Sequence, residues 1–168
     1  TVDVYPKTSG IDEDFSINKE VLLPYGKHRR ILEEFVENNF DYLIIRLPGI
    51  FGKGLKKNPL YDLIQKDFTY INPRSSLQFY NLAYLWADIN KSLEHNLKIV
   101  NFISEPLTLD EVAMAVLGLN LPNESMVNTQ QYDIHSKYGS LWGNAKPYLY
   151  LKDKVLTDLK YFAARFSI

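Results

Sequence analysis

Cysteine is absent from the 168-residue chain, which excludes a disulfide framework, a thiolate zinc site and a cysteine nucleophile. A chain without cysteine also fits a reducing compartment, so we expect a cytoplasmic protein. Long apolar runs are absent as well, and none approaches the roughly 18 residues that a membrane-spanning helix needs. The segment Thr1–Tyr5 does not resemble a signal peptide. We therefore expect no membrane partner.

Neither basic nor acidic residues are in clear excess. The chain has 19 basic and 20 acidic residues, which gives a formal net charge of -1. No overall field would concentrate nucleic acid on such a surface. The three histidines are too scattered to suggest a metal site. We therefore expect neither a nucleic-acid partner nor a bound metal.

The composition is that of an ordinary globular protein, with 46% hydrophobic and 23% charged residues. A chain of this size can enclose one continuous hydrophobic core, so residues 1–168 are expected to form a single unit. Strand-like and helix-like runs alternate along the chain, which is typical of an α/β fold. Residues 6–20 are polar and predict a surface loop.

The first helix is predicted from Pro24 to about Asn39. Proline favours the first helical turn. Apolar residues then recur at the spacing of one buried face: Ile31, Leu32, Phe35 and Val36. Directly afterwards, Asp41–Arg46 is a short apolar run of the kind that parallel sheets bury on both sides.

Later elements have recognisable ends or faces. Asn58–Pro59 looks like an N-cap before proline at the first helical position, and Thr108 with Glu111 forms a capping box for a helix that Gly118 ends. A second buried strand is predicted at Leu97–Ile103, and a short hairpin around 68–80. Two further helices are predicted from their apolar faces: Leu82, Leu85, Trp86, Ile89 and Leu93 after a cap at Asn81, and Val155, Leu156, Leu159 and Phe162.

A glycine-rich dinucleotide-binding turn is missing. The motif G-x-G-x-x-G, which receives a pyrophosphate at a helix N-terminus, occurs nowhere in the chain. The nearest candidate, residues Gly49–Gly54, follows the wrong strand and has the wrong spacing. We predict a loop there.

Tyr25 and Arg29 are four residues apart on the first predicted helix, so their side chains project from one face about one turn apart. A phenol beside a fixed cation suits hydride-transfer chemistry, in which the phenol exchanges a proton with a substrate carbinol or carbonyl. Moving a tyrosine pKa from about 10 to near 7 requires roughly 4 kcal/mol of preferential stabilisation of the phenolate. A neighbouring cation in a partly buried site can supply energy of that order.

An ordinary helix surface would explain the same residues without any chemistry. Tyr25 would then cover the helix, while Arg29 and Arg30 pair with Glu33 and Glu34 in solvated ion pairs. Such pairs contribute about 0.3 kcal/mol each. On residue types alone, this alternative stays open.

A series of motifs in sequence order resembles the extended short-chain dehydrogenase/reductase family, the NAD-dependent epimerase/dehydratase group. The segments are Thr1–Tyr5, Tyr25–Arg29, Arg46–Gly52, Gln78–Leu82 and Asn101–Thr108. They resemble the family's strand-end Ser/Thr, Y-x-x-x-K helix, R-x-x-N-x-x-G loop, R-D-F-x-H-V segment and N-x-x-S-x-E-P-x-[ST] stretch. The resemblance implies the C-terminal part of a Rossmann-like doubly wound parallel sheet plus a small, mostly helical substrate-binding lobe. The dinucleotide-binding part would precede Thr1.

The resemblance also implies roles for individual residues. Tyr25 would be the general acid/base, Thr1 would hydrogen-bond the reacting oxygen, and Arg29 stands where the family has a lysine that binds the nicotinamide ribose. The cofactor, NAD or NADP, would contact Tyr25, Arg29 and Pro48. A sugar-nucleotide or related sugar substrate would contact Thr1, Asp3, Gly49, Lys56 and Arg74. Lys56 belongs to a lysine-rich turn of a kind that is also common in solvated loops.

Three positions depart from the family pattern. Arg29 is longer and planar, and it is less able than lysine to lend a proton to a relay. Gly49 replaces an asparagine that contacts the substrate phosphates in many members. Val2 replaces the acid that protonates the departing hydroxyl in 4,6-dehydratases, so reduction or epimerisation is favoured over dehydration.

Two interpretations of the whole chain follow. In the first, it is the catalytic and substrate-side part of an NAD(P)-dependent oxidoreductase or epimerase, inactive without the upstream part. In the second, it is a non-catalytic interaction or dimerisation module derived from that fold, which Phe35, Val36 and Phe40 could serve. We expect a homo-oligomer, because Asp41–Arg46 and Leu97–Ile103 would expose strand edges without further neighbours.

Overall fold

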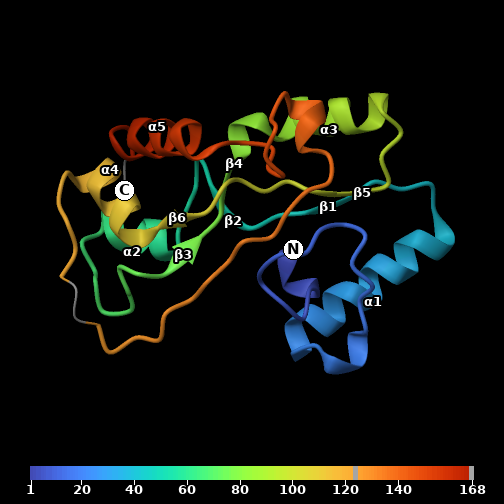
Figure 1. Cartoon of the computed structure of the whole chain (residues 1–168), viewed down its shortest axis with the longest axis horizontal. Coiled ribbons are helices and arrows are strands. Elements are labelled where there is room, and N and C mark those ends of the chain that lie inside the picture. Colours follow the sequence, from blue (N-terminus) through green and yellow to red (C-terminus); the bar gives the residue numbers. More distant parts are fainter. Residues whose placement is uncertain (123–124, 167–168) are drawn as a thin grey trace.

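The computed structural model describes residues 1–122 and 125–166 (Figure 1). The α-helices in chain order are α1 (Pro24–Asn39), α2 (Pro59–Ile64), α3 (Leu85–Glu94), α4 (Leu109–Leu117) and α5 (Lys152–Ala163). The strands are β1 (Ile44–Arg46), β2 (Gly49–Phe51), β3 (Ser76–Leu77), β4 (Phe79–Asn81), β5 (Ile99–Asn101) and β6 (Leu107–Thr108). Short 3₁₀ helices are η1 (Val2–Val4), η2 (Lys19–Val21), η3 (Leu82–Tyr84) and η4 (Gly139–Trp142).

The strands pair across long stretches of sequence. β1 and β5 are parallel, with Ile44 opposite Ile99, and β2 and β4 are parallel, with Gly49 opposite Phe79. β3 pairs antiparallel with β6. The parallel pairing of the two predicted buried strands confirms the α/β fold class. The hairpin expected around 68–80 is wrong, because β3 and β4 each pair with a strand far away in the sequence.

The loop predicted at residues 49–54 is wrong in its first half. Gly49–Phe51 forms β2, and the buried Phe51 side chain packs into the core. Gly49 lets the two strands approach closely, since a β-carbon there would lie 3.2 Å from the carbonyl oxygen of Gln78. Only the remainder is a turn, in which the backbone N–H of Leu55 donates to the carbonyl of Gly52 at 3.2 Å.

Of the three hydrophobic clusters among the described residues, two support the two ends of the molecule. The larger lies among α2, α4, α5 and the β2–β4 pair, which gather on one side in Figure 1. Its buried members include Phe51, Leu60, Leu63, Phe79, Leu107, Val112 and Leu159. The smaller lies beneath η1 and consists of Val2, Val4, Tyr5, Ile11, Ile103, Ile134 and Tyr148. The second cluster positions the first residues of the chain.

Helix ends lie where the sequence predicts them. α1 begins at Pro24 and ends at Asn39. The Asn58 side chain caps α2 by accepting the backbone N–H of Tyr61 at 3.0 Å. α4 has its capping box, and Gly118 ends it with a left-handed φ of 70°. The start of α2 and both ends of α4 depend on local hydrogen bonds, which is why local sequence is enough to predict them.

The predicted buried face of α1 is wrong. Ile31, Leu32 and Phe35 are 45%, 51% and 55% exposed, whereas Gly26 and Glu33 are buried. The buried face of the helix is instead the one that carries Glu33, which can pair with a buried cation. Part of the predicted α3 face is also exposed, namely Trp86 and Leu93.

A polar segment is attached to the start of α1. Lys19 of η2 forms an ion pair with Glu34 at 2.7 Å, and Lys27 pairs with Glu20 at 2.6 Å. These two pairs hold η2 against the helix that carries Tyr25.

Candidate functional site

The first residues of the chain lie between α1 and the start of β2. The backbone N–H of Val2 donates to the carbonyl of Leu47 at 3.1 Å, which places η1 beside Pro48. On its other side, η1 packs against Gly26 of α1, next to Tyr25. Thr1, Pro48 and the first turn of α1 are therefore neighbours.

Thr1 caps η1, where the sequence had indicated the end of a strand. Its Oγ1 donates to the Asp3 carboxylate at 2.8 Å and accepts the Asp3 backbone N–H at 3.3 Å.

Tyr25 and Arg29 form a stacked pair on α1. The Arg29 guanidinium lies 5.1 Å from the centroid of the Tyr25 ring, and Tyr25 is 53% exposed. Arg30 instead forms the ion pairs with glutamate, with its Nη1 at 3.1 Å from Glu33 and 2.6 Å from Glu37. The helix-surface interpretation thus holds for the ion pairs of Arg30, while Arg29 is engaged with the phenol.

A buried ion pair joins this helix to β1. Arg46 is 2% exposed, and its guanidinium donates to both Glu33 oxygens, at 3.1 and 2.7 Å. Burial alone would lower the pKa of Arg46, but Glu33 and Tyr5 outweigh it and raise the pKa above its usual value. An arginine that ends an apolar strand needs a buried partner, so the sequence indicates an ion pair at Arg46 but does not identify Glu33 as the partner.

Tyr5 and Asn101 extend the buried network towards β5. Arg46 Nη1 donates to the Tyr5 hydroxyl at 2.7 Å, and Asn101 Nδ2 donates to the same oxygen at 3.0 Å. The backbone N–H of Asn101 donates to Glu13 at 2.8 Å. Burial raises the pKa of Tyr5, so its phenol stays protonated and has a structural role.

Tyr132 lies beside the first residues of the chain. Burial raises its pKa, and the negative charge of Asp3 raises it further. Its ring packs against the cluster beneath η1. The residue comes from a loop remote in sequence, so no local pattern could have indicated it.

The structure divides the predicted site residues into three groups. Thr1, Asp3, Tyr25, Arg29 and Pro48 gather around η1, with the exposed Gly49 directly after Pro48. Lys56 instead lines a hollow at the carboxyl ends of β2 and β4. Arg74 lines another, of about 690 Å³, together with Asn72 and residues 125–129.

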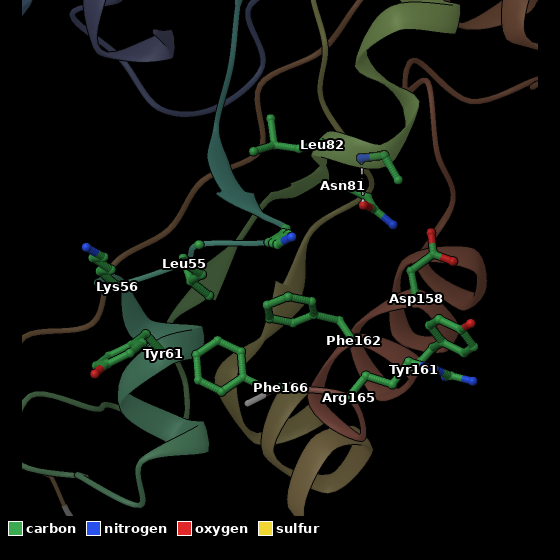
Figure 2. A pocket seen from close by; sticks show the side chains of 14 residues that line it. Leu55, Lys56, Tyr61, Asn81, Leu82, Asp158, Tyr161, Phe162, Arg165 and Phe166 are labelled. Carbon is green, nitrogen blue, oxygen red and sulfur yellow. Dashed lines mark hydrogen bonds between the residues drawn. The ribbon is translucent and has the colours of Figure 1, made fainter. Parts of the chain in front are cut away.

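The Lys56 hollow is the larger of these two, at about 1180 Å³ (Figure 2). Its walls are the β2–α2 turn, η3 and one face of α5. The lining residues are Gly52, Lys53, Gly54, Leu55, Lys56, Tyr61, Asn81, Leu82, Ala83, Asp158, Tyr161, Phe162, Arg165 and Phe166.

Neither a metal-binding cluster nor a membrane-spanning helix occurs in the described part of the chain. Across residues 1–122 and 125–166, no group of three or more histidine, cysteine, aspartate or glutamate residues could hold a metal ion. None of the helices in that part of the chain is long and apolar enough to cross a membrane.

No family model and no curated protein matches the sequence. Solved structures do match the fold. The Bordetella bronchiseptica enzyme WbmG in complex with NAD and UDP superposes with a TM-score of 0.67 and 14% identity, over 93% of this chain and 53% of that one. dTDP-glucose 4,6-dehydratase from Bacillus anthracis in complex with NAD superposes with a TM-score of 0.63 and 13% identity, over 96% of this chain and 58% of that one. UDP-N-acetylglucosamine 4-epimerase from Bacillus cereus superposes with a TM-score of 0.57 and 17% identity, over 94% of this chain and 60% of that one.

The chain spans little more than half the length of these structures, and identities of this size establish the fold alone. Parallel strand pairs flanked by helices agree with that likeness. The chain therefore has the fold of the extended short-chain dehydrogenase/reductases, as its motif series predicts.

Proposed function

We propose that this chain is the catalytic and substrate-side part of an NAD(P)-dependent oxidoreductase or epimerase that acts on a sugar nucleotide or related sugar. The dinucleotide-binding part would be supplied by sequence preceding Thr1. The observation that carries the proposal is the stacked Tyr25–Arg29 pair beside Thr1, which caps η1.

The pair has the chemistry that proton exchange at a carbinol requires. The Arg29 guanidinium lies over the Tyr25 ring, so a cation stands beside the phenol that would exchange the proton. Thr1 Oγ1 both donates and accepts hydrogen bonds within η1, so it could exchange the Asp3 carboxylate for a substrate oxygen. Arg29 cannot lend a proton, so its role would be electrostatic.

The surroundings also fit a nicotinamide cofactor. Tyr25 and Arg29 are exposed side by side, and both can donate hydrogen bonds to ribose hydroxyls. When bound, the cofactor would supply or accept the hydride. Pro48 would close the other side of that space. NAD in WbmG and in the dehydratase, and UDP in WbmG, support this assignment of cofactor and substrate class.

The test is a longer chain that includes the sequence preceding Thr1. We expect NADH or NADPH fluorescence titration to show binding by the longer chain and none by residues 1–168 alone. Tyr25→Phe in the longer chain should abolish turnover while cofactor binding persists. A longer chain that binds neither cofactor would refute the proposal.

A non-catalytic interaction or dimerisation module is the second candidate. The exposed apolar face of α1, formed by Ile31, Leu32 and Phe35, favours it. So does arginine in the lysine position at Arg29. The Arg29→Lys variant of the longer chain separates the two: turnover that appears only in this variant would indicate a site that has drifted from catalysis.

A further inference from the structure

The tyrosine that ends η1 joins this short helix to β1 and β5. At its start, η1 is held by the bond from Val2 to Leu47, and Figure 1 shows it beside the first part of α1. Tyr5 ends η1, with its backbone N–H donating to the Val2 carbonyl at 3.0 Å. Its buried side chain reaches the last residues of both strands. The place of the Tyr5 hydroxyl therefore affects the place of Thr1.

Two buried polar side chains share this hydroxyl. Arg46 and Asn101 are the last residues of β1 and β5, and they lie opposite one another in the parallel register. Arg46 Nη1 donates to the Tyr5 oxygen at 2.7 Å and Asn101 Nδ2 donates to it at 3.0 Å. The hydroxyl in turn donates to Asn101 Oδ1 at 3.1 Å. One buried oxygen thus links η1 to both strands.

The Asn101 amide uses its full set of donors. Besides the bond to Tyr5, its Nδ2 donates to the His135 carbonyl at 2.8 Å. Each N–H of the amide therefore has an acceptor, and the amide oxygen accepts from Tyr5. Asparagine is the smallest side chain that combines two donors with an acceptor. A buried polar network whose members are all satisfied is rigid and specifies one arrangement.

Asn101 is also fixed by contacts other than Tyr5. Its backbone N–H donates to Glu13 at 2.8 Å. The same carboxylate accepts the Ser136 hydroxyl at 2.7 Å and the Lys137 backbone N–H at 2.9 Å. Glu13 lies between η1 and η2, whereas Ser136 and Lys137 lie far along the chain. These contacts hold Asn101 in place, so it can serve as a fixed support for η1.

The other end of the network reaches the helix that carries Tyr25. Arg46 donates to both Glu33 oxygens on α1 as well as to Tyr5. Its guanidinium lies 4.8 Å from the centroid of the Tyr5 ring. The end of η1 and the middle of α1 therefore share one buried cation.

From this arrangement we infer that Asn101 is a positioning residue of the candidate site. Through the Tyr5 hydroxyl it sets where η1 lies relative to α1, and therefore where the Thr1 hydroxyl lies relative to Tyr25. Misplacing a catalytic group by about 1 Å can cost roughly 100-fold in rate. That consequence for catalysis rests on the proposed function, whereas the positioning itself does not.

A distance between η1 and α1 tests the inference in residues 1–168. The chain has no cysteine, so spin labels attach only to cysteines that are introduced, here by Asp3→Cys and Asn38→Cys. Both side chains are exposed, and Asn38 lies roughly 18 Å along α1 from Gly26, which packs against η1. Double electron–electron resonance, with unlabelled chain in excess to suppress signals between copies, should give one narrow distance.

Asn101→Ala in the labelled chain should abolish this single narrow distance, because the Tyr5 hydroxyl loses its bonds to the amide. Tyr5→Phe removes the same bonds and keeps a ring in the cluster beneath η1. It should have the same effect, and it tests the inference even if Asn101→Ala does not fold. The two changes act on one interaction, so the double variant should give no broader a distribution than either single variant.

Asp88→Asn is the matched control, because Asp88 is also buried and holds a polar network. The network lies in a different hydrophobic cluster, and its donors are Tyr80, Trp142 and Tyr150. This change should lower the resistance to urea and leave the distance between η1 and α1 unchanged.

An unchanged distance in both Asn101→Ala and Tyr5→Phe would overturn the inference. Equal broadening in Asp88→Asn would overturn it too, because it would indicate general loosening of the fold. None of these results depends on turnover. Failure of the proposed function would instead be recognised in the longer chain, by the absence of cofactor binding.

Discussion

The carbonyl oxygen of Asp3 lies 2.1 Å from the point where a β-carbon on Gly26 would stand. No side chain fits between these two backbones, so glycine is the residue that allows η1 to rest on α1. The same contact sets how close Thr1 comes to Tyr25, the residue before Gly26. Local packing of backbone on backbone thus determines the geometry of the candidate site.

Gly26→Ala tests this contact. Alanine favours a helix over glycine by about 1 kcal/mol. The clash with Asp3 should outweigh this gain and lower the free energy of unfolding by about 1–3 kcal/mol. Urea unfolding followed by circular dichroism measures the change. His28→Ala, on the exposed side of the same helix, should stay within about 0.5 kcal/mol of the parent. A stabilised Gly26→Ala variant would contradict the contact.

Glu33→Gln should be the most damaging of the conservative changes on α1. It leaves the buried Arg46 without a counter-charge, which typically costs about 3–5 kcal/mol. The midpoint of urea unfolding gives the loss. Glu37→Gln is the matched control, because Arg30 keeps Glu33 and Glu34 as partners, and it should cost under about 1 kcal/mol. Equal losses in the two variants would argue against a special role for the buried pair.

The Glu111 carboxylate should make the helical lobe sensitive to acid. Burial alone would raise its pKa, but hydrogen bonds from Lys152 and Thr108 outweigh this and hold the pKa below the usual value. A folded-state pKa below the unfolded one contributes stability above about pH 4.3, and that stability is lost as the pH falls through the folded value.

Unfolding free energies at about pH 7 and pH 3.5 measure this contribution. Glu111→Gln should reduce the difference between the two pH values. The exposed Glu94→Gln should leave the difference unchanged. If the parent and Glu111→Gln respond identically to acid, the hydrogen bonds from Lys152 and Thr108 do not stabilise the lobe.

Self-association should depend on the exposed face of α1. Ile31, Leu32 and Phe35 form a contiguous apolar stripe of the kind that proteins cover. Size-exclusion chromatography of residues 1–168 should show a dimer or larger species, and Ile31→Glu with Phe35→Glu should convert it to a monomer. A parent chain that elutes as a monomer at all concentrations would contradict this expectation.

Local sequence predicted those parts of the fold that local interactions determine. Pro24 opens α1, Asn58 caps α2, and Thr108 with Gly118 bounds α4, as predicted. The pairing of Tyr25 with Arg29 on one face also followed from helical spacing alone. Each of these features needs only residues within about one turn.

Features that depend on distant partners were beyond prediction. The run 68–80 looks like a hairpin, but β4 pairs with β2 and β3 with β6, and nothing within the run indicates those partners. The spacing of apolar residues on α1 predicted a face that favours burial, but it did not indicate which part of the molecule or which partner covers that face. The helix-surface alternative placed Glu33 in a solvated pair, and nothing within α1 indicates Arg46, which lies on a different element.

The ion pairs Lys19–Glu34 and Lys27–Glu20 have a practical consequence. Dissolved ions screen partly exposed pairs strongly at about 1 M salt, where the Debye length is about 3 Å. The η2 segment should then detach from α1 while the rest of the chain stays folded. Trypsin would cut after Lys19 sooner in concentrated salt than in dilute buffer. The solvent exposure of the first turn of α1, near Tyr25, should therefore increase with ionic strength.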